Sequence, residues 1–314
     1  MPTFATADGA ELHYDIYGDR SDDDSRDRAG CCGAPVLVAL AGGPARHPDY
    51  LEDLAGLADR TGPRRVVVPH LRGVGKSPAP EDLERGTFWH QAEDLEALRE
   101  HLGVARLVLL AHSAGTRLAV SYAARFPRQV AGLVLVTPSV SYLVDVLPDA
   151  DGGVDSCADA DVDAGVEAVV ARRRGERCFD AAWQALQQGP DTSSDEAFNV
   201  WSRATAPATY ATWGQRERAH AGTGRWCLSA ARTFVSGALP ADIQARLRSL
   251  VAPVLVMAGS DDTLVELASV QTVTAVFTDG RLVVVDGCGH YPWVERPTQF
   301  RQAVDSFLAD LAQA

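Results

Sequence analysis

The sequence is poor in lysine and carries an excess of acidic residues. Lys76 is its single lysine, and the other basic residues are arginines. Asp and Glu number 42 against 29 Lys and Arg, so the formal net charge is −13. A chain of this charge repels a polyanion, which argues against nucleic acid as a partner. We expect the partner to be a small-molecule substrate.

Long apolar runs are also absent from the sequence. No run reaches the length needed to cross a bilayer. Residues 1–9 have neither the basic segment nor the apolar segment of a secretory signal. We therefore expect a cytoplasmic protein without a membrane partner, and leave its oligomeric state open.

The six cysteines are too few and too scattered to form a disulfide scaffold in 314 residues. None of them forms a CxxC pair, and none is spaced with histidine as zinc ligands are. We interpret the cysteines as reduced thiols and expect no metal and no organic cofactor.

The chain alternates short apolar runs with helical patterns. Nearly all-apolar runs are typical of strands that are covered on both faces, as in a parallel sheet. The alternation predicts βαβ units and hence an α/β fold with a doubly wound, mostly parallel sheet. An Asp-Gly turn between residues 4–6 and 11–17 predicts a hairpin at the front. Strands are expected at 35–41, 65–69, 105–111, 130–136, 253–258 and 281–285, and helices at 48–60, 87–102, 116–126, 265–277 and 297–311.

Two segments interrupt this alternation. Residues 19–33 are polar and charged, which predicts a surface loop. Residues 140–238 contain no strand-like run, begin with an acidic stretch and hold four of the six tryptophans. We predict that residues 1–139 and 239–314 form the core and that residues 140–238 form an inserted helical cap.

The strongest chemical signal surrounds Ser113. Residues 109–116 read Leu-Leu-Ala-His-Ser-Ala-Gly-Thr, so an apolar strand runs through small residues directly into a helix. This pattern is typical of a nucleophile elbow, G-x-S-x-G, with Ala111 in place of the first glycine. The helix N-terminus that follows would supply the Ala114 N–H to an oxyanion. Gly43, in the glycine turn after the strand at 35–41, is our candidate for the second N–H donor.

A serine hydroxyl needs a base, and the base needs an acid partner. His290 ends a glycine-rich loop after the last strand, where doubly wound sheets place their sites. Residues 254–262 end another strand with two candidate acids, Asp261 and Asp262. We choose Asp262, although one of the two could instead cap the following helix. The resulting triad is Ser113, Asp262 and His290.

Together these motifs resemble the α/β-hydrolase superfamily over nearly the whole chain. They are the Ala-Gly-Gly-Pro turn at 41–44, the segment His-Leu-Arg-Gly-Val-Gly-Lys-Ser at 70–77, the elbow, the Gly-Ser-Asp-Asp piece at 259–262 and the Gly-Cys-Gly-His loop at 287–290. The Gly-Gly-Pro turn and the arginine segment resemble the proline iminopeptidase group, whose acid position supports Asp262. The group usually has His where Ala41 stands and Trp where Ala114 stands.

The resemblance implies a serine hydrolase that forms an acyl-enzyme on an ester or amide, with an iminopeptidase-like activity as one form. That activity needs a cap carboxylate to hold an ammonium group. Glu176, Asp195, Glu196 and Glu217 are available, and we take Glu196, with a solvated surface carboxylate as the alternative. Trp183, Trp201 and Trp213 are candidates for an apolar pocket or for the core of the cap. A biosynthetic thioesterase or cyclase and a hydrolase-like ligand-binding receptor are the alternatives.

Overall fold

The computed structural model describes residues 2–18, 36–58, 65–139 and 163–313. Within these residues, eight strands form one sheet in the order β1-β2-β4-β3-β5-β6-β7-β8. Strands β1 and β2 pair antiparallel, and the six from β3 to β8 run parallel. The predicted fold class is confirmed. The strands are β1 (Thr3–Ala5), β2 (Glu11–Tyr17), β3 (Val36–Leu40), β4 (Val66–Pro69), β5 (Leu107–His112), β6 (Val130–Val136), β7 (Val254–Gly259) and β8 (Gly280–Val285).

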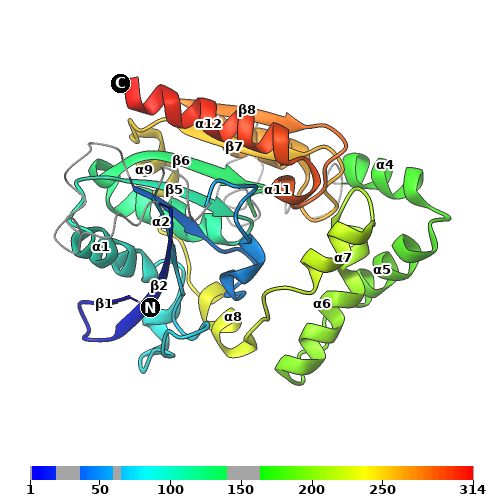
Figure 1. Cartoon of the computed structure of the whole chain (residues 1–314), viewed down its shortest axis with the longest axis horizontal. Coiled ribbons are helices and arrows are strands. Elements are labelled where there is room, and N and C mark those ends of the chain that lie inside the picture. Colours follow the sequence, from blue (N-terminus) through cyan, green and yellow to red (C-terminus); the bar gives the residue numbers. More distant parts are fainter. Residues whose placement is uncertain (1, 19–35, 59–64, 140–162, 314) are drawn as a thin grey trace.

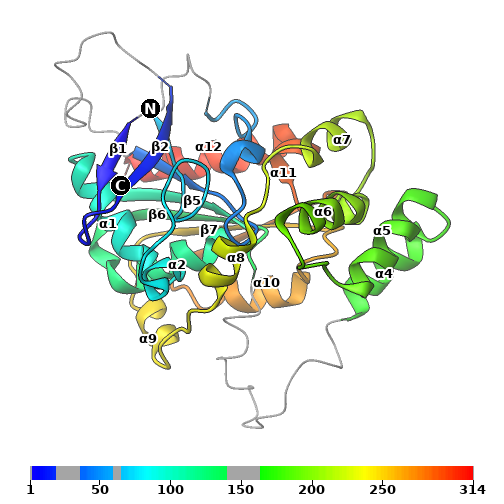
Figure 2. The ribbon, with the colours of Figure 1, turned by 90° about the horizontal axis from the view of Figure 1, so that it is seen from below.

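Both faces of the sheet are covered over its inner strands, which explains why β3, β4, β6 and β7 are apolar, whereas the edge strand β8 carries the exposed Arg281. Along β3, Val36, Val38 and Leu40 belong to one core, whereas Leu37 and Ala39 belong to the other. Figures 1 and 2 show the two helical layers on either side of the sheet. One layer contains α1 (Gln91–His101), α2 (Gly115–Arg125), α9 (Ile243–Arg248) and α10 (Leu267–Thr274), and the other contains α11 (Pro292–Glu295) and α12 (Pro297–Gln313).

Between β6 and β7 the described part of the chain is helical and contains no strand. Most of these helices lie beyond the carboxyl ends of the parallel strands (Figure 1). The boundary predicted at residue 140, the loop 19–33 and residues 145–162 lie outside the described residues, so the inserted cap domain stays a prediction. Below, the word cap denotes only helices α4–α8 and the turns between them. The helices are α4 (Asp163–Arg173), α5 (Arg177–Gln188), α6 (Asp195–Thr209), α7 (Gln215–Ala221) and α8 (Leu228–Val235).

The helix predicted at 48–60 is wrong. A short 3-10 turn, η1, covers only Pro48–Leu51. Glu52 and Leu54 then adopt positive φ angles of 49°, which no right-handed helix accommodates. Leu51, Leu54 and Leu57 are all buried in the core on the α12 side of the sheet. Tertiary packing of this segment therefore outweighs its helix propensity. Two further 3-10 turns are η2 (Leu83–Gly86) and η3 (Pro127–Gln129).

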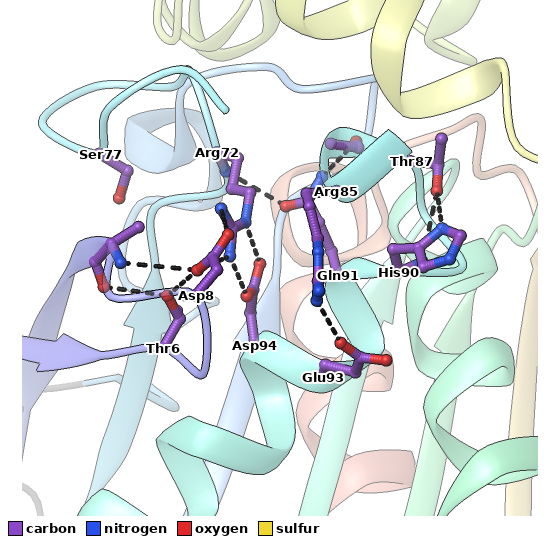
Figure 3. A network of polar contacts seen from close by, with 12 residues as sticks. Thr6, Asp8, Arg72, Ser77, Arg85, Thr87, His90, Gln91, Glu93 and Asp94 are labelled. Atoms are coloured by element: carbon purple, nitrogen blue, oxygen red, sulfur yellow. Dashed lines mark hydrogen bonds and ion pairs between the residues drawn. The ribbon is translucent and has the colours of Figure 1, made fainter. Parts of the chain in front are cut away.

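A buried arginine ties the N-terminal hairpin to the core. Arg72, on the loop after β4, donates to both carboxylate oxygens of Asp94 on α1, each at 2.7 Å. It also donates to both oxygens of Asp8 in the β1–β2 turn, at 2.9 and 3.0 Å (Figure 3). The backbone N–H of Arg72 donates to Gln91 Oε1 at 3.1 Å. One guanidinium thus joins three segments that are distant in the sequence.

None of the helices in the described ranges is long and apolar enough to span a membrane.

Candidate active site

Ser113 occupies a strained turn between β5 and α2. Its φ is +49°, a left-handed conformation that is unusual for any residue other than glycine. The backbone is held there because Ser113 N donates to Val136 O at 2.9 Å and Ser113 O accepts from Thr116 N at 3.0 Å. The side chain of Ser113 is only partly buried. The strain and the exposure together are what a nucleophile elbow requires.

The elbow packs so closely on the turn after β3 that side chains are excluded between them. A Cβ on Gly115 would stand 2.4 Å from Ala41 O, and one on Gly42 would stand 2.9 Å from Ser113 Cβ. The turn therefore lies directly beside the serine.

Replacing Gly115 by alanine is expected to destabilise the protein by about 1–3 kcal/mol, because the methyl group would force the elbow and the turn apart. Gly165 in α4 is the matched control, since a Cβ there meets nothing within 4 Å. Gly165→Ala makes the same chemical change on an exposed helix and should be neutral or stabilising. Urea unfolding of both variants measures the difference, and equal stability of the two would contradict this packing argument.

Two backbone N–H groups near Ser113, those of Gly43 and Ala114, have no acceptor among the described residues. Ala114 is the N-cap residue of α2, so its N–H lies at the positive end of that helix. Gly43 has a φ of +48° in the turn after β3. These are the two donors that the sequence proposed for an oxyanion.

The structure brings His290 to Asp262 and not to Asp261. His290 Nδ1 donates to Asp262 Oδ2 at 2.7 Å, and both side chains are buried. The other oxygen of Asp262 accepts from the backbone N–H of Leu264 at 2.8 Å. Asp261 instead lies 2.8 Å from the guanidinium of Arg172. With Nδ1 protonated by this contact, Nε2 of His290 is left as a proton acceptor.

His112, which precedes Ser113 in the chain, contacts His290. The rings of His112 and His290 are 4.8 Å apart, and His112 Nε2 donates to His290 O at 3.0 Å. Within the described residues, no hydrogen bond joins the Ser113 hydroxyl to the His290 ring. Such contacts are often long in an unliganded enzyme and shorten when substrate binds.

His112 also connects the His290 loop to the glycine turn. Its Nδ1 accepts from the Tyr50 hydroxyl at 2.9 Å, and that hydroxyl accepts in turn from the backbone N–H of Gly42. Burial and the neighbouring His290 lower the pKa of His112 well below its usual value, so the ring stays neutral. No sequence pattern indicated this network, because Tyr50 falls in the segment that was predicted to be helical.

The loop that carries His290 is also docked on the cap. His290 N donates to Thr209 O at 2.9 Å. The carboxylate of Glu295 accepts from Gly289 N at 3.0 Å and from Ala211 N, just after α6, at 2.7 Å. Burial raises the pKa of Glu295 to about 7. This glutamate, which the sequence analysis missed, thus joins the histidine loop to the cap.

Glu295→Gln tests this environment through the pH dependence of stability. Since the pKa of Glu295 is raised in the folded state, the unfolded chain ionises first, and stability falls as pH rises from about 5 to 7. The glutamine side chain does not titrate. The free energy of unfolding of the wild type should therefore fall by roughly 2 kcal/mol more than that of Glu295→Gln across this range. Urea denaturation at about pH 5 and pH 7 measures the free energy of unfolding of both proteins. Equal changes with pH in the two proteins would contradict the raised pKa of Glu295.

The structure places the three tryptophans predicted as substrate contacts in different surroundings. Trp183 stacks on Phe179 and lines a surface hollow of about 350 Å³ that contains no triad residue. The indole N–H of Trp201 donates to Ala185 O at 3.0 Å, which joins α6 to α5. Trp213 packs on Tyr210, which stacks on Tyr291 beside His290.

The structure places Glu196 on the surface of the cap. Its carboxylate lies 2.7 Å from the guanidinium of Arg225 and 3.5 Å from that of Arg203. The hydrogen bond with Arg225 lowers the pKa of Glu196. The structure does not bring this carboxylate to Ser113. Trp226, another of the four tryptophans between residues 140 and 238, lies against the glycine turn at Gly43, and the sequence analysis did not select it.

These features match a known family. The α/β hydrolase fold model matches residues 35–297. The chain belongs to this family. The predicted resemblance is therefore confirmed, and membership supports a hydrolase activity. Among the described residues, no group of three or more His, Cys, Asp or Glu side chains is arranged to hold a metal ion.

Curated relatives and solved structures agree with this assignment. The chain is 36% identical to a proline iminopeptidase from Lactobacillus helveticus over 131 residues, which span 40% of each chain. It is 25% identical to one from Lactobacillus delbrueckii subsp. bulgaricus, over 88% of this chain and 90% of the relative. An esterase structure from a Rhodococcus species shares the fold with a TM-score of 0.62, at 24% identity over 99% of this chain and 98% of that one.

Proposed function

We propose that the protein is a serine hydrolase that cleaves a small ester or amide through an acyl-enzyme on Ser113. One observation carries the proposal: the buried Asp262–His290 pair leaves an imidazole acceptor, and His112, which directly precedes the left-handed Ser113, packs on that imidazole with ring centroids 4.8 Å apart. The N–H groups of Gly43 and Ala114, which donate to none of the described residues, add the donors that a developing oxyanion needs.

In the proposed reaction, Ser113 Oγ attacks the carbonyl carbon while His290 Nε2 accepts the hydroxyl proton. Asp262 keeps the proton on Nδ1 and stabilises the imidazolium that forms. The negative charge moves to the carbonyl oxygen, where the N–H groups of Gly43 and Ala114 bind it. His290 then donates its proton to the leaving group as the bond to that group breaks. Water attacks the acyl-enzyme by the same path and releases the acid and the serine.

The proposed substrate is small and carries a bulky apolar group. A proline-iminopeptidase-like activity is the second candidate, because both curated relatives are proline iminopeptidases. Glu196 does not support that activity, since it is exposed and paired with arginines instead of facing Ser113. The elbow also departs from the usual pattern of that group at Ala114.

A panel of chromogenic substrates tests the proposal: p-nitrophenyl esters, proline p-nitroanilide and acyl thioesters. We expect ester turnover that is lost in Ser113→Ala. Rapid cleavage of the anilide would establish the iminopeptidase activity, and preferred cleavage of thioesters would establish a thioesterase. Absence of turnover on every substrate, with a folded protein, would contradict the proposal and favour a ligand-binding role.

A further inference from the structure

The C-terminal end of α6 lies against the loops that carry Asp262 and His290. A helix leaves its last four backbone carbonyls without partners in the helix itself. In α6 these carbonyls belong to residues 207–209 and to the C-cap residue Tyr210. All four accept hydrogen bonds from other parts of the chain. Residues 207–211 are called the α6 end below.

The two central carbonyls of the α6 end bind the two catalytic loops. Ala208 O accepts from the hydroxyl of Thr263, the residue after Asp262, at 2.8 Å. Thr209 O accepts from His290 N at 2.9 Å. One donor is therefore a triad residue, and the other adjoins one. The α6 end thus bridges the acid and the base independently of the hydrogen bond between their side chains.

The α6 end is itself held on both sides. Arg173 on α4, which is 3% exposed, donates to Pro207 O at 3.4 Å and to Tyr210 O. On the other side, Ala211 N donates to the buried carboxylate of Glu295 on α11 at 2.7 Å. The α6 end therefore has the support from surrounding contacts that a positioning element requires.

Glycines bring the α6 end and both loops into direct contact. A Cβ on Gly289 would stand 2.7 Å from Thr209 O, and one on Gly259 at the end of β7 would stand 2.2 Å from Gly289 O. In addition, Asp261 N donates to Cys288 O at 2.8 Å, which joins the acid loop to the histidine loop. Because no side chain separates these segments, a displacement of one is transmitted to the others.

We infer that the α6 end positions Asp262 against His290 and that Thr263 is the positioning residue on the acid side. The inference rests on the proposed serine hydrolase function. Thr263 takes no part in the proposed proton transfers and acts through Asp262. Without its hydroxyl, the acid loop loses its anchor on α6, and the imidazole is held less accurately beside Ser113. Misplacing a catalytic group lowers kcat, whereas substrate binding is not affected.

Substitutions of Thr263 test the inference. Thr263→Val deletes the hydroxyl at nearly constant volume, and Thr263→Ser keeps the hydroxyl and removes a methyl group. Thr205→Val is the matched control. Thr205 is 3% exposed and also lies on α6, but its hydroxyl donates to Ser202 O within the same helix. Steady-state kinetics on a p-nitrophenyl ester and urea unfolding are measured for each variant.

Thr263→Val should lower kcat about tenfold and change KM by less than about twofold. Thr263→Ser should restore about half or more of the wild-type kcat, and Thr205→Val should leave kcat unchanged. The rate at which a fluorophosphonate labels Ser113 should fall in the same proportion as kcat. A purely structural hydroxyl would lower the free energy of unfolding and leave kcat of the folded enzyme unchanged.

Wild-type kcat in folded Thr263→Val, an equal loss in Thr205→Val, or a loss in Thr263→Ser as large as in Thr263→Val would overturn the inference alone. Absence of turnover in the wild type, together with failure of the fluorophosphonate to label Ser113, would overturn the proposed function and the inference with it. Should Thr263→Val fail to fold, Thr263→Ala decides, because it deletes the hydroxyl without placing a methyl group against Ala208 O.

Discussion

Asp262→Asn is expected to lower kcat on the best ester substrate by about 10⁴-fold, with little change in KM or in stability. The Oδ1 position of residue 262 accepts from Leu264 N, and an asparagine oxygen can take its place there. The amide nitrogen would then face His290 Nδ1. Because an amide nitrogen only donates, it would force the histidine proton onto Nε2, and an Nε2 that carries a proton cannot accept one from Ser113.

Asp261→Asn is the matched control for this prediction. It makes the same chemical change one residue away, but Asp261 pairs with Arg172, whose side chain is 57% exposed. The control should change kcat less than threefold, because exposed ion pairs contribute little. Steady-state kinetics on both variants measures the contrast. An Asp262→Asn enzyme with a tenth or more of the wild-type kcat, or equal losses in the two variants, would contradict the assigned acid.

Arg72→Met is expected to cost about 3–5 kcal/mol of stability. The variant removes the cation from a buried cluster and leaves two carboxylates, Asp94 and Asp8, facing each other. Arg246 pairs with Asp242 on the surface of α9, so Arg246→Met should cost less than about 1 kcal/mol. Chemical denaturation of both variants at pH 7 provides the comparison, and equal losses would show that burial does not decide the effect.

The same arginine makes the stability of the protein depend on pH. Hydrogen bonds from Arg72 hold the pKa of Asp8 well below its usual range, although burial alone would raise it. A lowered pKa in the folded state stabilises above the unfolded value near 4, and this stabilisation is lost as pH falls further. The stability difference between wild type and Arg72→Met should therefore narrow below pH 4. A constant difference from pH 7 to pH 3 would contradict the ion pairing.

The sheet was predictable because its signals are local. Continuous apolar runs such as the one in β5 arise when both faces of a strand are covered. The strand predicted at 105–111 is observed at Leu107–His112, and the bounds of the others agree at least as well. The segment 48–60 failed for the opposite reason. Its conformation depends on the burial of Tyr50 and Leu54 against distant parts of the chain, which no local pattern records.

In the candidate site, too, some residues could be predicted from local sequence patterns and others could not. Ser113, Asp262 and His290 each follow an apolar strand, so their shared edge of the sheet could be inferred from the chain order alone. The positions of Trp226 and Asn199, and the contact of Glu295 with Ala211 N, depend on how the cap folds onto the core. Glu196 is exposed and paired with arginines, a placement that the composition of its segment does not determine.

The central claim is that Ser113 is a nucleophile activated by His290. A fluorophosphonate probe tests it directly, because the probe bonds covalently only to an activated serine. Intact mass and peptide mapping should show one adduct, located on Ser113, in the wild type and none in Ser113→Ala or His290→Ala. An adduct on another residue, or unchanged labelling of Ser113 in His290→Ala, would contradict the account.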